Sequence, residues 1–146
     1  MDQSRLAQLV DSVTPRILNG NGLKISDIVV QPDEALLTSI DTALSVVLSV
    51  KVREAVYDYL ARELSLARED IPSHLAQFIN LLEKTFGIGA ATLQRRIIKV
   101  LYQTLGWEAI DVVDFGLTEH FALINAIIER IQLITKSTPS SQVVTK

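Results

Sequence analysis

Apolar residues recur every three or four positions along most of the chain, which is the spacing of one face of an α-helix. The stripes fall in six stretches of sequence, which are residues 6–18, 32–48, 52–64, 73–86, 90–105 and 117–136. Such stripes predict amphipathic helices that pack their apolar sides together. The sequence therefore predicts an all-α fold, a single-domain bundle of about six helices.

Residues that start or stop helices lie between the first stripes. We expect Thr14 to cap a second helical start at Pro15, because proline suits the first position of a helix. Asn19–Gly22 predicts a loop, since both residue types tolerate positive φ. The next stretch, Lys24–Val30, suits a helical turn, which we favour, or a short strand. Pro32 then opens a helix with acidic residues in its first turn.

Later boundaries follow the same chemistry. A stretch rich in serine and β-branched residues predicts a break near Ser49. We expect Asp70 or Ser73 to cap the next helix, and Gly87 to adopt the left-handed conformation just past its end. Gly106 should close the helix that follows.

The C-terminal part should hold a connector and one long helix. Trp107–Gly116 predicts a connector, and Leu117 to about Lys136 predicts the helix. Ser137–Lys146 is polar with one proline, so we expect a disordered tail. The predicted organisation is a helical domain over 1–136 and a tail over 137–146.

The composition is apolar for a small helical protein. Hydrophobic residues make up 48% of the chain and charged residues 21%, and the mean hydropathy is +0.28, which excludes a disordered chain. We expect association to cover the apolar surplus, as a homo-oligomer or with a protein partner, through the helix Leu117–Ile134 or Leu36–Leu48. The alternative is a monomer with a well-filled core.

Compartment and membrane association follow from what the sequence lacks. There is no cysteine, so disulfides and cysteine-based zinc sites are excluded. The apolar runs are shorter than the roughly 20 residues that a membrane span needs. The first residues also lack the apolar run of a signal peptide. We expect a cytoplasmic protein that does not enter a membrane.

Motifs for catalysis and cofactors are missing. The two histidines, His74 and His120, form no zinc-binding pattern, and no serine stands in a nucleophile elbow. Gly87-Ile88-Gly89 begins like a dinucleotide-binding motif, but no strand precedes it. Acids near His120 could form a weak carboxylate site, although they suit the start of a helix better. We therefore expect no enzyme activity, no cofactor and no metal.

The charge is unevenly distributed although the net charge is only −3. Residues 31–70 carry four basic and eight acidic residues. Residues 71–106 carry four basic residues against Glu83 alone. One basic segment therefore stands inside an acidic protein, and this asymmetry is the main electrostatic signal of the sequence.

That segment resembles a helix-turn-helix over residues 75–105. Gly87 would make the turn, while Ile88 and Leu93 would anchor the second helix on the first. The residues expected to face DNA are Thr92, Gln94, Arg95, Arg96 and Lys99. Glutamine and arginine can contact base edges, and Arg96 and Lys99 would contact phosphates.

Two features oppose DNA binding. Glu83 stands where such motifs usually hold a small residue, and the isoelectric point is near 5.3, whereas DNA-binding domains are commonly basic. The alternative is an ordinary helical hairpin. Its basic residues would then be solvated or would pair with the acidic segment 31–70.

A second resemblance covers Val52–Gly106. The stretch carries Leu66 to Pro72, then Phe-Gly-Ile-Gly-Ala at 86–90, then Leu-Tyr-Gln-Thr-Leu-Gly at 101–106. This pattern resembles the Nitrosopumilus-type output domain of archaeal signal-transduction proteins. The resemblance implies a helical output module in regulation and brings no catalytic residue with it. It also does not call for arginine at positions 95 and 96.

Three functions remain open from the sequence. The first is a non-enzymatic regulatory or signalling output module that acts through helical surfaces and self-associates. The second is a helix-turn-helix transcriptional regulator. The third is a helical protein that binds an apolar ligand between its helices.

Overall fold

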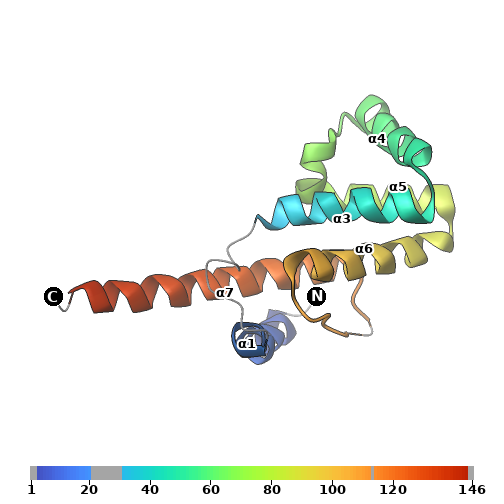
Figure 1. The fold of residues 1–146 in the computed structure, drawn as a ribbon. Helices are drawn as coiled ribbons and strands as arrows, with labels where there is room; N and C mark the ends of the chain where they lie inside the picture. Colours follow the sequence, from blue (N-terminus) through green and yellow to red (C-terminus); the bar gives the residue numbers. More distant parts are fainter. Residues whose placement is uncertain (1–2, 21–30, 113, 145–146) are drawn as a thin grey trace. The chain divides into compact units, whose positions relative to one another are not determined.

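A computed structural model describes residues 3–20, 31–112 and 114–144. These residues form six α-helices and one 3₁₀ helix, η1, and contain no strand (Figure 1). The predicted all-α, multi-helix fold is therefore confirmed. The chain divides into two compact units, one from residues 1–30 and 119–146 and the other from residues 31–118. The single-domain interpretation stays a prediction.

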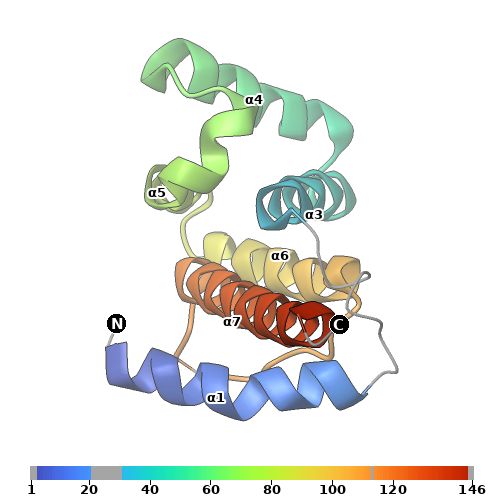
Figure 2. The same cartoon turned by 90° about the vertical axis from the view of Figure 1, so that its left-hand side faces the viewer.

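The unit 31–118 is built on α3 and α6. Helix α3 spans Pro32–Val47 and α6 spans Gly89–Leu105, and these two make the most extensive helix contact. Figure 2 shows α6 beneath α3 and α5, with α4 on their other side. Leu36, Ile40 and Leu44 of α3 are fully buried. These three positions are therefore covered within the unit, whereas Val47 at the end of the Leu36–Leu48 stripe is 38% exposed. Self-association through this stripe stays a prediction.

Local sequence explains how α3 and α4 begin. Pro32 occupies the first turn of α3, followed by two acidic residues, as predicted. The break near Ser49 is also confirmed, since α4 spans Val50–Leu64. The Ser49 hydroxyl accepts a hydrogen bond from the backbone N–H of Val52 at 3.1 Å, which satisfies an N–H in the first turn of α4.

The expected cap at Asp70 or Ser73 is wrong. The chain forms η1 over Arg68–His74 and passes directly into α5, which spans Leu75–Phe86. A side-chain cap needs a residue with extended backbone at the helix start. Because the backbone keeps turning through Pro72, neither Asp70 nor Ser73 takes that conformation, and His74 occupies the N-cap position without a side-chain hydrogen bond to the first turn of α5.

The two glycine stops are confirmed. Gly106 follows α6 in the left-handed conformation, with φ of +75° and ψ of 21°. Gly87 also ends its helix, but its φ of +58° is combined with a ψ of −129°, so the left-handed conformation expected for it is wrong. Both glycines lie in the region of positive φ that favours glycine. The described part of the connector 107–116 is not helical, and α7 starts at Leu117, as predicted.

Helix α1 spans Gln3–Gly20 without a break, so the expected restart at Pro15 is wrong. Val10, Val13 and Ile17 are all buried, so the apolar stripe continues across the proline. Burying each such side chain contributes about 1.5–3 kcal/mol, which offsets the roughly 3 kcal/mol that a proline costs inside a helix. The buried Thr14 donates its hydroxyl hydrogen bond to the Val10 carbonyl at 2.6 Å and caps nothing.

Helix α7 spans Leu117–Val144, so the expected end near Lys136 and the expected tail over 137–144 are wrong. Serine and threonine cost only a few tenths of a kcal/mol in a helix, and extending a helix is easier than starting one. Pro139 in the same stretch costs roughly 3 kcal/mol, and nothing in the structure explains why the helix continues past it. The predicted loop also begins later than expected, because α1 includes Asn19 and Gly20. Residues 21–30, including the ambiguous Lys24–Val30, lie outside the described residues.

Candidate functional site

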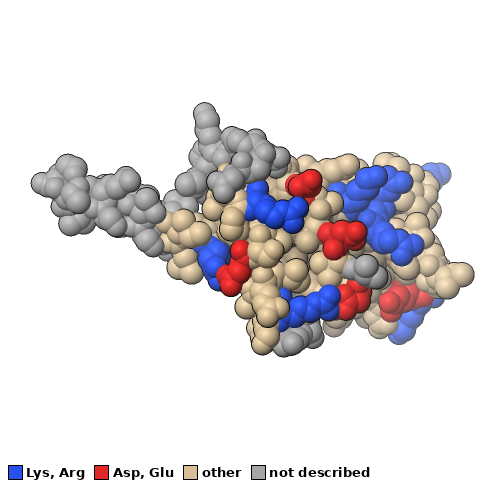
Figure 3. All heavy atoms as spheres, turned by 90° about the horizontal axis from the view of Figure 1, so that it is seen from below, with Lys and Arg blue, Asp and Glu red and all other residues tan. Residues whose placement is uncertain are grey.

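The outer side of α6 carries a row of exposed polar and basic side chains. Thr92, Arg95, Arg96 and Lys99 are all exposed, and their spacing places them on one face of the helix. We call these four residues the basic face of α6. Figure 3 shows basic side chains at its right-hand end, with acidic side chains beside them; α6 begins at this end in Figure 1.

The opposite side of α6 fixes this orientation. Leu93, Ile97 and Leu101 are buried, at spacings of four residues. When a helix buries this stripe, Thr92 and the positions three, four and seven residues after it lie on the exposed side. The basic face is therefore a direct consequence of the apolar pattern.

The cations of the basic face have no partner among the described residues. No hydrogen bond or ion pair within that part of the chain involves Arg95, Arg96 or Lys99. Asp41, in the acidic segment, is instead bound by Arg68. The structure therefore does not support the alternative in which the basic residues pair with segment 31–70, and they are solvated.

Two expected roles in the helix-turn-helix are wrong. The side-chain oxygen of the half-buried Gln94 accepts a hydrogen bond from the backbone N–H of Leu117 at 3.3 Å, so Gln94 does not join the basic face. Ile88 is 96% exposed and anchors nothing, because it lies at the tip of the turn between α5 and α6. Leu93 is buried, as predicted.

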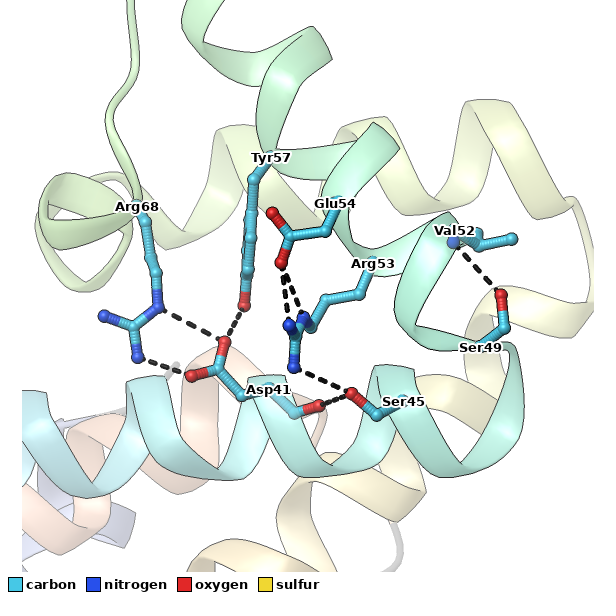
Figure 4. A network of polar contacts seen from close by, with 8 residues as sticks. All are labelled: Asp41, Ser45, Ser49, Val52, Arg53, Glu54, Tyr57 and Arg68. Atoms are coloured by element: carbon cyan, nitrogen blue, oxygen red, sulfur yellow. Dashed lines mark hydrogen bonds and ion pairs between the residues drawn. The ribbon is translucent and has the colours of Figure 1, made fainter.

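A polar network joins α3, α4 and η1, and Figure 4 shows Asp41 of α3 at its centre. The Tyr57 hydroxyl donates to Oδ1 of Asp41. Arg68 approaches with two nitrogens, Nε at 3.2 Å from Oδ1 and Nη2 at 2.6 Å from Oδ2. Arg53 donates to the Ser45 hydroxyl at 3.0 Å. The network thus holds α4 and the start of η1 against α3.

The network changes the titration of its members. Burial raises the pKa of Asp41, but the hydrogen bonds and charge of Arg68 and the hydrogen bond of Tyr57 lower it by more. The resulting pKa of Asp41 is below its ordinary value. Burial and the carboxylate of Asp41 both raise the pKa of Tyr57, which therefore stays protonated at neutral pH. The arrangement is an ion pair with a neutral hydroxyl donor and contains no group poised for proton transfer.

A groove of about 460 Å³ opens between α4 and α5. Helix α4 lines it with Val52, Ala55, Val56 and Tyr59. Helix α5 lines it with Leu81, Lys84, Thr85 and Phe86. The sequence predicted the α4 stripe but not the groove, because the groove depends on how far two helices stand apart. Tyr59 of the predicted stripe lines the groove and is 45% exposed.

Among the described residues no cluster of three or more histidine, aspartate or glutamate side chains could hold a metal ion. No helix within the described ranges is long and apolar enough to cross a membrane. Comparisons with protein-family models, curated proteins and solved structures find no match to this chain.

Proposed function

We propose that this protein is a non-enzymatic regulatory module whose basic face of α6 binds the phosphate backbone of duplex DNA. One observation carries the proposal: Arg95, Arg96 and Lys99 lie together on one exposed helical face without an acidic partner in the described residues. An anionic partner can bind such solvated cations without first breaking an existing ion pair.

The spacing of the cations suits a polyanion. From Thr92 to Lys99 the helix rises about 10 Å, and the face can therefore meet more than one phosphate of a duplex. Arginine can bind a phosphate with two parallel hydrogen bonds, and the Thr92 hydroxyl can donate another. A single small anion would use only part of this face.

The proposal is limited to the backbone. Gln94 is the residue of this segment best suited to contact adenine, but its side-chain oxygen accepts a hydrogen bond from the backbone N–H of Leu117 at the start of α7. The net charge of −3 also opposes approach to DNA. We therefore expect salt-sensitive binding with little sequence preference, which is typical of contacts to phosphate.

The test is fluorescence anisotropy of a labelled duplex of mixed sequence, titrated with protein at several salt concentrations. Three phosphate contacts predict a slope of about −2.7 in a plot of log affinity against log salt concentration. Replacing two of them, by Arg95→Ala plus Arg96→Ala, should reduce the slope to about −1 and weaken binding at low salt.

A matched control removes the same charge elsewhere. Lys51 and Arg62 are exposed on α4, away from the basic face. Lys51→Ala plus Arg62→Ala should lower affinity much less than the α6 double variant. Equal losses in the two variants would mean that only the total charge matters. No binding of the wild-type protein at micromolar concentration and low salt would refute the proposal.

A further inference from the structure

The groove between α4 and α5 is independent of the basic face of α6. On α4, Val52, Ala55, Val56 and Tyr59 share one helical face, which forms one wall. Leu81 and Phe86 supply the apolar part of the other wall. The volume of about 460 Å³ lies within the roughly 300–1,000 Å³ of small-molecule sites in proteins.

The polar groups in this groove select for one sign of charge. Lys84 is its one lining cation, and none of the residues that line it is acidic. Within the described residues no ion pair involves Lys84. The hydroxyls of Tyr59 and Thr85 add hydrogen-bond donors. The adjacent Glu83 does not line the groove, so the charge of Lys84 is not neutralised inside it.

We propose that this groove binds an aliphatic monocarboxylate, with its chain against the apolar walls and its carboxylate on the Lys84 ammonium. Apolar walls alone would accept any oily molecule, and the unpaired lysine adds the preference for an anionic head. Tyr59 and Thr85 can donate to the second carboxylate oxygen.

The volume of about 460 Å³ sets the scale of the ligand, which is that of a small molecule with one aliphatic chain. Dodecanoate is close to this size. It is therefore the probe of choice, with dodecylammonium as the probe of equal length and opposite charge.

The test is isothermal titration calorimetry of each probe below its micelle concentration. The wild-type protein should bind one dodecanoate and prefer it to dodecylammonium by up to about fivefold, the range of an exposed ion pair. Lys84→Glu should reverse this preference. Lys51→Glu makes the same charge change on the surface of α4 outside the groove and should leave the preference unchanged.

A second variant tests the location. Ala55→Trp places a large side chain on an exposed position of the α4 wall and should weaken dodecanoate binding about tenfold, with the helical circular dichroism signal unchanged. Arg95→Ala plus Arg96→Ala should leave dodecanoate binding intact, which separates this site from the DNA proposal. The inference is overturned if wild-type protein fails to bind dodecanoate, if Lys84→Glu keeps the wild-type preference, or if Ala55→Trp binds normally.

Discussion

At the scale of the residue, two pairs of the same chemistry differ in environment. Asp41 and Arg68 have side chains 28% and 31% exposed and meet through two hydrogen bonds. Asp58 and Arg62 are 63% and 62% exposed and lie four residues apart on α4. Water screens the second pair, whereas the first pair is partly desolvated and joins two elements. Only the Asp41 pair should matter for stability.

Asp41→Asn should lower the free energy of unfolding by about 1–2 kcal/mol, because Arg68 and Tyr57 lose the charge that they bind. Asp58→Asn should change it by less than about 0.5 kcal/mol. Urea denaturation followed by circular dichroism measures both changes. Equal effects would show that the network around Asp41 adds nothing beyond an exposed ion pair.

The same comparison has a defined pH dependence. Burial raises the pKa of Asp41, but Arg68 and Tyr57 lower this pKa by more than burial raises it. The pKa of Asp41 in the folded protein is therefore below the ordinary 3.8. A carboxylate of this kind stabilises the fold above its unfolded pKa, and this contribution is lost as pH falls through its folded pKa. The difference between wild type and Asp41→Asn should therefore be constant near neutral pH and shrink below about pH 4. A difference that persisted unchanged into acid would contradict this.

Single residues also show where sequence reasoning stops. Spacing alone placed Arg95 and Arg96 outward, because helical periodicity relates them to the buried Leu93 and Ile97. The prediction for Gln94 was wrong because its hydrogen-bond partner, the backbone N–H of Leu117, lies 23 residues away in the sequence. The anchoring role predicted for Ile88 was wrong because the exposure of this side chain depends on the path of the turn between α5 and α6. The basic face could be predicted, and the long-range contact could not.

At the scale of the element, the starts and stops that depend on local chemistry were predictable. Pro32, Ser49, Gly87 and Gly106 each act on the backbone within a few residues, and each ends or begins a helix as expected. Pro15 behaves differently because burial on both sides of it outweighs its local cost. The groove is likewise a property of two elements together, so the α4 sequence alone could not predict it.

Replacing Pro15 or Pro32 by alanine should have different effects on the free energy of unfolding. Pro15 lies inside α1, so Pro15→Ala restores a backbone hydrogen bond and should raise the free energy of unfolding by up to about 3 kcal/mol. Pro32 is in the first turn of α3, where its missing N–H costs nothing. Pro32→Ala should therefore be neutral or destabilising by up to about 1 kcal/mol, because it loosens the unfolded chain. Thermal unfolding of both variants measures the order, and a larger gain from Pro32→Ala would refute the argument.

At the scale of the whole molecule, the charge distribution has a simple arrangement. Acidic residues of segment 31–70 meet arginines from the same segment, as in Asp41 with Arg68 and Asp58 with Arg62. The cations of α6 have no such partner among the described residues, within a chain whose net charge is −3. An acidic protein can therefore present a local basic surface, which the isoelectric point alone would not reveal.

We expect the two compact units to unfold in one cooperative transition. The smaller unit holds only α1 and α7 among its described helices, and two helices bury too little apolar surface for independent stability. We therefore expect the chain to unfold as one domain, as the sequence predicted. Trp107, the sole tryptophan, is buried in the unit 31–118, so its fluorescence reports on that unit, whereas far-ultraviolet circular dichroism reports on all helices. Coincident urea transitions by the two probes are expected. A circular dichroism transition that continues after the fluorescence change is complete, or begins well before it, would mean two separate domains.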